Sequence, residues 1–278
     1  MGCIVGGAIG DVLGGVTERN QLSISDDTQL TLATCEAIIA KGKVLPDAVA
    51  AAFLRWFKAG NVTGVGSSTL KALRDLSAGA HWALAGAKGE RAAGNGAAMR
   101  IAPLAFVLDP WDKSHRVIVR DVSRITHHND EAYLGALVVL LAIHANTLDP
   151  DPSFFNSLIE NLPDSRVRDR LIEFTDIQSD TTIQQVAAKY GTSGYVVETV
   201  PLALYAATKI TQETFEKAMN ELIEAGGDTD TTCAITGQIA GAHLGYSKLP
   251  ENLLALGPVN EVIASAENFA RAILEINT

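Results

Sequence analysis

Apolar residues recur at three- and four-residue spacing along most of the chain, which is the pattern of helices with one buried face. Many of these segments begin near Ser, Thr, Asp or Pro, the residues that favour a helix start. Only 116–122, with the sequence RVIVRDV, is typical of a strand. The pattern therefore predicts an all-α protein of about a dozen helices, among them 28–41, 46–59, 67–77, 96–107, 130–145, 198–209, 211–225, 230–246 and 260–276.

No break in composition, repeat or low-complexity tract divides the chain, so residues 1–278 are expected to form a single domain. The 24 glycines and an aromatic content of only 6 % favour closely packed helices. Gly6, Gly10 and Gly14 recur every four residues and give one segment a small-residue face that another helix can approach. We expect a monomer.

The net charge of −10 and the lack of any Lys/Arg run argue against a nucleic-acid groove and an anionic-membrane surface. A nucleic acid is expected only as a modified substrate. The three cysteines form no CxxC pair, which indicates a reducing compartment. The apolar start MGCIVGGAIGDVLGG has no basic residue and contains Asp11, so it does not have the pattern of a secretion signal. We expect a cytoplasmic protein without a membrane span.

Two acidic clusters stand directly before apolar helical segments. SISDDTQL holds Ser25, Asp26 and Asp27, and GGDTDTTCAITG holds Asp228 and Asp230. One acid is enough to cap a helix, and several acids at an apolar helix start must be exposed, protonated or neutralised by a cation. Oxygen ligands suit Mg²⁺, Mn²⁺ or Ca²⁺ better than Zn²⁺. If the two helix starts meet, their four carboxylates would balance two divalent ions.

Other interpretations of these clusters remain open or fail. N-capping with charge–dipole contacts, worth ~0.3–1 kcal/mol per charge, explains either cluster taken alone. An EF-hand loop counted from Asp228 needs Gly and Glu where the chain has Cys233 and Ile239. The spacing also resembles the nucleophile loop of haloacid-dehalogenase-type phosphatases. That loop follows a buried strand, whereas NELIEAGG has the pattern of a helix end.

Two glycine-rich turns precede helical segments, where backbone N–H groups can bind an anion. One is TGVGSSTLKAL at 63–73 and the other is GNGAAMRIAPLAFVL at 94–108. Two such turns suit a diphosphate, although an ordinary loop and cap explains each one alone. His127 and His128 stand at a further helix start, where one ring either faces a pocket or makes a structural hydrogen bond.

Taken together, these motifs resemble the ADP-ribosylglycohydrolase family. They follow the family's order over residues 6–242: GGAIGDVLGGVTE, SDDT, GVGSST, GNGAAMRIAPLA, THHNDEA and GGDTDTTCAITGQIAGA. The last is the most specific. The resemblance implies an all-α orthogonal multi-helix bundle with a site for two divalent cations, Mg²⁺ or Mn²⁺.

The resemblance also implies roles for individual residues. The metal ligands it implies are Ser25, Asp26, Asp27, Asp228, Asp230 and Thr231. Glu18 and Asp27 are implied as catalytic residues, with Glu18 positioning or activating water. The ADP-ribose cleft is implied to be lined by Gly64, Gly66, Ser67, Ser68, Gly94, Asn95, Gly96, Ala97, Met99 and His127. The chain departs from the family pattern at Ala92, where a polar residue is frequent, and at Gly64, where some bacterial members have an acid.

The implied reaction is hydrolysis of the bond between ribose C1″ of ADP-ribose and an acceptor atom, through an oxocarbenium-like transition state. The expected partner is an ADP-ribosylated protein, with arginine linkage favoured by family habit, or an ADP-ribosyl small molecule. Serine-linked, O-acetyl and nucleic-acid-linked ADP-ribose stay open as substrates. A non-catalytic ADP-ribose-binding protein is a further alternative, against which the six retained ligand positions argue.

Overall fold

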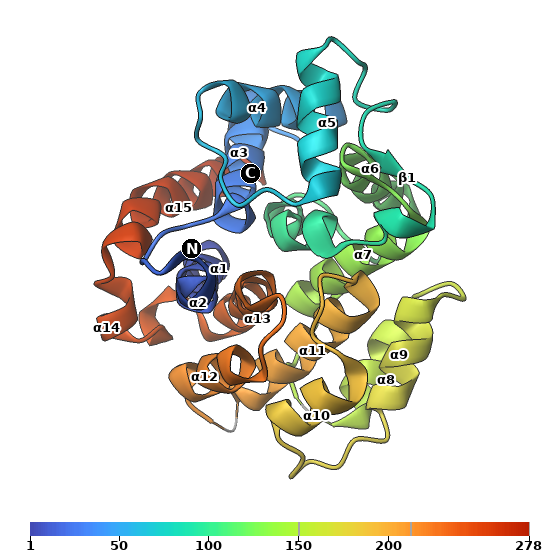
Figure 1. Cartoon of the computed structure of the whole chain (residues 1–278), viewed down its shortest axis with the longest axis vertical. Coiled ribbons are helices and arrows are strands. Elements are labelled where there is room, and N and C mark those ends of the chain that lie inside the picture. Colours follow the sequence, from blue (N-terminus) through green and yellow to red (C-terminus); the bar gives the residue numbers. More distant parts are fainter. Residues whose placement is uncertain (150, 212, 278) are drawn as a thin grey trace.

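The computed structural model describes residues 1–149, 151–211 and 213–277, including their side chains except those of Thr17 and Glu18. Over these residues the chain forms fifteen α-helices, four short 3₁₀ helices and two strands of two residues each (Figure 1). The predicted all-α class is confirmed.

The first half of the chain contains α1 (Gly2–Gly14), α2 (Val16–Arg19), α3 (Asp26–Lys41), α4 (Pro46–Lys58), α5 (Ser67–Ser77), β1 (Ala87–Lys88), η1 (Glu90–Ala92), η2 (Asn95–Arg100), η3 (Ala102–Phe106), α6 (Lys113–Arg124), β2 (His127–His128) and α7 (Asp130–His144). The second half contains α8 (Pro152–Ile159), α9 (Arg166–Phe174), α10 (Ile183–Tyr190), α11 (Val196–Lys209), α12 (Phe215–Ala225), α13 (Thr229–Leu244), η4 (Tyr246–Lys248), α14 (Glu251–Leu254) and α15 (Gly257–Ile276). The two strands pair in parallel, with Ala87 opposite His127.

The core forms around helices that are apolar on nearly every side. Ten residues of α7 between Ala132 and Ala142 are buried, and the helix packs against α6, α11, α13 and η2. A helix that is apolar all round must be enclosed by other elements. The surrounding helices therefore hold α7 at the centre of one bundle.

Helices α1 and α13, from opposite ends of the chain, lie side by side (Figure 1). Their backbones touch through glycines: a Cβ added at Gly6 would lie 2.3 Å from the carbonyl oxygen of Gly237, and one at Gly10 would lie 2.0 Å from that of Cys233. Only glycine permits such an approach. The small-residue face predicted for 6–14 thus has its partner in α13.

Two of the predicted elements are wrong. The strand-like segment 116–122 lies in α6, which Asp112 caps by accepting a hydrogen bond from the Ser114 N–H. Its valines alternate as in a strand, but Val119 and Val122 form the buried face of a helix. The helix predicted over 96–107 is two 3₁₀ helices, η2 and η3, separated at Ile101. Pro103 lacks an N–H and disfavours the α conformation before it, which ends a continuous helix.

We expect Gly10→Ala to lower the free energy of unfolding, because its methyl would collide with the backbone of α13. Overpacking typically costs about 1–3 kcal/mol, and a collision with backbone should cost at least that much. Gly257→Ala is the matched control, since a Cβ there meets nothing within 4 Å in the first turn of α15. Urea unfolding of the two variants measures the difference. Equal stabilities would contradict the close contact of α1 and α13.

Candidate metal and ligand site

Five aspartates from three helices gather at one end of the α1–α13 pair. Asp26 and Asp27 lie in the first turn of α3, Asp228 and Asp230 lie at the start of α13, and Asp11 comes from within α1. One carboxylate oxygen each of Asp11, Asp27 and Asp230 lies within 4.8 Å of the others. The expectation that the two acidic clusters meet is confirmed.

Ser25 and Asp11 hold the start of α3 in place. The Ser25 Oγ lies 2.8 Å from Oδ1 of Asp11 and 2.9 Å from Oδ2 of Asp27, and its single proton can serve only one of them. Asp11 Oδ2 also accepts hydrogen bonds from the Ser25 N–H and the Thr28 hydroxyl, at 2.8 and 2.6 Å. Asp11 is therefore occupied by donors of the protein, whereas Oδ1 of Asp27 is buried with no hydrogen-bond partner among the described residues.

The carboxylates raise one another's pKa values. Burial, and then the neighbouring aspartates, hold the pKa values of Asp26 and Asp27 well above the ordinary range. Burial and the adjacent Asp228 raise the pKa of Asp230 to about 6. Burial also raises the pKa of Asp11, against the opposing effect of its hydrogen bonds and of Arg19. At neutral pH the cluster therefore needs positive charge nearby to compensate its carboxylates.

Arg19, at the end of α2, supplies one such charge. Its Nη2 lies 3.0 Å from Oδ1 of Asp11, and its Nη1 lies 3.4 Å from Oδ2 of Asp230. One guanidinium cannot balance five carboxylates. Buried oxygen donors, an unpartnered carboxylate oxygen and this excess of negative charge together fit a hard divalent cation.

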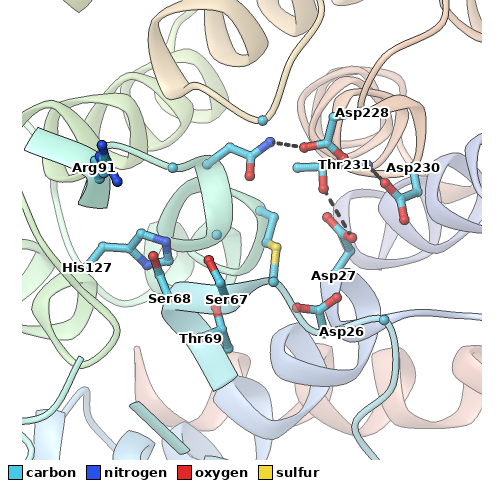
Figure 2. Close-up of a pocket in the computed structure, with 17 residues that line it drawn as sticks. Asp26, Asp27, Ser67, Ser68, Thr69, Arg91, His127, Asp228, Asp230 and Thr231 are labelled. Atoms are coloured by element: carbon cyan, nitrogen blue, oxygen red, sulfur yellow. Dashed lines mark hydrogen bonds between the residues drawn. The ribbon is translucent and has the colours of Figure 1, made fainter. Parts of the chain in front are cut away.

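A cavity of about 340 Å³ opens beside the cluster (Figure 2). Asp26, Asp27, Asp228, Asp230 and Thr231 form one wall. The Thr231 hydroxyl lies 3.4 Å from Oδ2 of Asp27, so it links the two acidic helix starts.

The two glycine-rich turns form the opposite wall, where Figure 2 shows Ser67, Ser68 and His127. Gly66 precedes α5 and has no capping side chain, so the first N–H groups of that helix stay available to a ligand. Asn95 joins the other turn to the acidic wall, since its Nδ2 donates to Oδ2 of Asp228 at 2.7 Å. The cavity thus has carboxylate oxygens on one wall and glycine-rich turns with uncapped backbone N–H groups on the other.

Among the expected site residues whose side chains the structure describes, all but Ser25 and Ala97 line this cavity. Ser25 lies behind the acidic wall, between Asp11 and Asp27. Ala97 is fully buried, because η2 turns its methyl into the core. Glu18 lies in α2, and its side chain is outside the part of the chain that the structure describes.

Sequence analysis missed several residues of the site. Asp11 was an argument against a secretion signal only, yet an acid within the apolar, glycine-rich segment GCIVGGAIGDVLG is itself a signal of a buried polar role. Thr69 ends the GVGSST motif but was not singled out, and Arg19, Arg91 and Gly194 have no local pattern that marks them. Only the folded chain brings Arg91 and Gly194 to the cavity and Arg19 to the aspartates.

Comparison with known proteins agrees with this geometry. A model of the family described as ADP-ribosylglycohydrolase matches residues 1–276. The chain belongs to the ADP-ribosylglycohydrolase family.

Members of the ADP-ribosylglycohydrolase family from two bacteria resemble the whole chain. The Rhodospirillum rubrum ADP-ribosyl-[dinitrogen reductase] glycohydrolase is 24 % identical over 92 % of this chain and 88 % of its own. The Pseudomonas putida ADP-ribosylarginine hydrolase Tri1 is 28 % identical over 90 % of this chain and 71 % of its own. A solved structure titled ADP-ribosylglycohydrolase-related protein complex shares the fold, with a TM-score of 0.66 and 24 % identity over 98 % of this chain and 96 % of that one.

The matched family consists of ADP-ribosyl hydrolases, so the resemblance found from the motifs is confirmed. Among the residues that the structure describes, no helix has both the length and the apolar character needed to span a membrane.

We expect Mg²⁺ or Mn²⁺ to raise the melting temperature of EDTA-treated protein, because a cation relieves repulsion among the buried carboxylates. Mass action gives about 2.7 kcal/mol at a hundredfold excess over Kd. Differential scanning fluorimetry measures the shift. Asp164→Asn, at an exposed ion pair with Arg168, is the control that keeps the full response.

The same experiment has a pH dependence. A carboxyl whose pKa is raised by folding stabilises the metal-free fold below its ordinary pKa and loses that contribution as the pH rises through the raised value, about 6 for Asp230. The metal-free protein should therefore be less stable at pH 7.5 than at pH 5, and the gain from added cation should be larger at pH 7.5. A cation effect that is absent at both pH values would contradict the site.

Arg19→Ala should raise the affinity for Mn²⁺ by roughly tenfold, because it removes a positive charge that contacts Asp11 and Asp230. Isothermal titration calorimetry measures this. Arg55→Ala is the control, since Arg55 pairs with Glu36 on the exposed surface. A weaker affinity in Arg19→Ala would mean that Arg19 supports the cluster rather than competing with the cation.

Proposed function

We propose that the protein is a metal-dependent hydrolase that cleaves the glycosidic bond between ADP-ribose and an acceptor, with ADP-ribosylated arginine as the preferred substrate. The observation that carries this proposal is the cavity itself, in which a wall of carboxylates faces a wall of glycine-rich turns. A ribose with a diphosphate needs both surfaces. We treat residues 1–278 as a single domain, which the family match over 1–276 supports.

The proposed ligands of two Mg²⁺ or Mn²⁺ ions are Ser25, Asp26, Asp27, Asp228, Asp230 and Thr231. Asp26 and Asp27 are supported by their place on the cavity wall and by the unpartnered Oδ1 of Asp27. Asp11 differs, since protein donors occupy both its oxygens. We therefore assign to Asp11 the task of orienting Ser25 and Thr28. Groups behind the ligands in this way commonly tune a metal site.

When bound, divalent cations polarise ribose hydroxyls and water. The chain's own residues would do the rest. The turn at Gly94–Gly96 and the start of α5 hold the diphosphate, and Asn95 keeps Asp228 in position. Buried carboxylates near C1″ stabilise the positive charge that develops in the oxocarbenium-like transition state.

We assign proton transfer to Glu18, with Asp27 as the second catalytic residue. The support for Glu18 is the family resemblance and its neighbour Arg19, whose guanidinium contacts the aspartate cluster. Proton transfer by a positioned carboxyl typically contributes about 10²–10⁴-fold to a rate.

Asp228→Asn is expected to reduce release of ADP-ribose from ADP-ribosylarginine by at least about a hundredfold, the usual scale for loss of a charge-stabilising group. The amide keeps the volume of the carboxyl, so the far-UV circular dichroism spectrum should stay that of the wild type. Asp164→Asn is the matched control on the exposed surface. Full turnover by Asp228→Asn, or by EDTA-treated wild type, would contradict the proposed mechanism.

A substrate panel decides the acceptor. ADP-ribosylarginine, ADP-ribosylserine, O-acetyl-ADP-ribose and an ADP-ribosylated nucleobase are compared by chromatography of released ADP-ribose. We expect the arginine conjugate to react fastest, as the name of the Pseudomonas putida relative, an ADP-ribosylarginine hydrolase, suggests. Faster cleavage of any other conjugate would overturn the arginine preference. Binding of ADP-ribose without cleavage of any conjugate would overturn the hydrolase assignment.

A further inference from the structure

Arg100, in η2, is a fully buried cation that forms no ion pair among the described residues, although the charge of Asp26 acts on it from farther away. Its Nη2 donates to Oγ1 of Thr126 at 2.8 Å and to the carbonyl oxygen of Val122 at 3.3 Å. Its Cζ lies 4.6 Å from the centre of the Phe53 ring. A buried charge without a counter-ion is costly to keep in a core. Of these contacts, only the one to Thr126 leads toward the cavity.

Thr126 is fully buried and stands between Arg100 and His127. Its Oγ1 accepts a hydrogen bond from Arg100 and lies 2.7 Å from Nδ1 of His127. A guanidinium has no acceptor, so the hydroxyl proton of Thr126 cannot go back to it. Nδ1 of His127 is the one acceptor that the described residues offer this proton. Because buried hydroxyl protons are normally satisfied, Nδ1 accepts it.

The other ring nitrogen of His127 then carries the proton and faces the cavity. A Cβ added at Gly94 would lie 3.2 Å from Nε2, and one at Gly96 would lie 3.3 Å from it. Nε2 has no hydrogen-bond partner among the described residues, and the ring lines the cavity beside Ser68 (Figure 2). Burial and the nearby Arg100 lower the pKa of His127 to about 3, so the ring is neutral at physiological pH.

We propose that Arg100 is a positioning residue that acts through Thr126 to fix His127 in its Nε2–H tautomer, so that the ring donates a hydrogen bond into the cavity. The acceptor we assign is an oxygen of the ADP-ribose diphosphate, and this assignment rests on the proposed function. The opposite tautomer would leave the Thr126 proton without an acceptor. A doubly protonated ring would add a second buried cation beside Arg100.

Nuclear magnetic resonance of ¹⁵N-histidine-labelled protein tests the tautomer directly, because two-bond ¹H–¹⁵N correlations distinguish the protonated from the unprotonated ring nitrogen. The chain has 6 histidines, and His127→Gln identifies the signal of interest by its loss. At pH 7 we expect His127 to be protonated at Nε2 alone. Protonation at Nδ1, or at both nitrogens, would overturn the proposal.

Thr126→Val removes the hydroxyl with little change of volume and should leave His127 as a mixture of the two tautomers. Thr126→Ser restores the hydroxyl and should restore the single tautomer. Thr208→Val is the matched control, since Thr208 is equally buried but its hydroxyl bonds to the carbonyl oxygen of Tyr205. A wild-type His127 spectrum in Thr126→Val would overturn the relay.

Arg100→Met removes the cation and keeps an apolar chain over Phe53. Without the guanidinium, the Thr126 hydroxyl loses the donor that holds one of its lone pairs and is free to turn. It can then accept from a protonated Nδ1 or donate to an unprotonated one, and we therefore expect both tautomers and a higher His127 pKa. A single Nε2–H tautomer with an unchanged pKa in folded Arg100→Met would overturn the part assigned to Arg100. If this variant does not fold, the Thr126 variants still test the relay.

Calorimetry with ADP-ribose tests the assigned acceptor. Loss of a donor to a charged oxygen should weaken binding by roughly tenfold in Thr126→Val and raise KM more than it lowers kcat. Thr126→Ser and Thr208→Val should bind as the wild type does. Equal binding by Thr126→Val would overturn the diphosphate as the acceptor. A wild type that shows the Nε2–H tautomer but binds no ADP-ribose would overturn the proposed function and still support the positioning role.

Discussion

The contact between the backbones of α1 and α13 is the constraint on which the site depends. Gly14 ends α1 where a Cβ would lie 2.3 Å from the carbonyl oxygen of Thr229, and the Thr229 hydroxyl donates to the Gly14 carbonyl at 2.7 Å. This closeness sets Asp11 of α1 against Asp230 of α13. Glycine within a helix costs roughly 0.5–1 kcal/mol relative to alanine. Here glycine lets the backbones of α1 and α13 approach more closely than any side chain would allow.

The carboxylates gathered by this contact oppose folding on their own. Asp27 is buried beside Asp11, and the pKa values of both are raised. Hydrogen bonds from Ser25 and Thr28 satisfy Asp11, and Arg19 offsets part of the charge. The negative charge that these groups do not offset lies on the cavity side, at Asp27. The fold thus satisfies the carboxylate of Asp11 with its own hydrogen bonds, whereas Oδ1 of Asp27 has no hydrogen-bond partner among the described residues.

The sequence predicts the long helices of this structure better than the short segments that connect them. Helical periodicity locates α3, α7 and α13 to within a few residues, because each has a long apolar run, and side chains also cap the starts of α3 and α7. It fails at η2 and η3, where Pro103 interrupts the α conformation, and at α6, where alternating valines imitate a strand. Such local conflicts are resolved only by packing.

The residues of the site also fall into two groups, those that a sequence pattern marks and those that only the fold reveals. Asp26, Asp27, Asp228 and Asp230 stand out because acids beside apolar helices are unusual, and family order links the two clusters. Asp11 lies inside the GGAIGDVLGGVTE motif and Arg19 directly follows it, but the contacts of both with Asp230 and with each other follow from distance in space rather than along the chain. Arg100 is hidden for the same reason. Its contact with Thr126 joins η2 to the turn between α6 and β2, two segments that sequence analysis treats separately.

The pairing of α1 with α13 has a consequence for biosynthesis. Thr231 and Asp27, whose side chains meet, are 204 positions apart. A chain emerging from the ribosome exposes Gly6, Gly10 and Asp11 first and must wait for almost its whole length before their partners are made. Contacts between such distant segments slow folding, because a long loop must close before they form. The aspartate cluster is therefore complete only after nearly the whole chain has been made, because Asp228 and Asp230 follow Asp11 by more than two hundred residues.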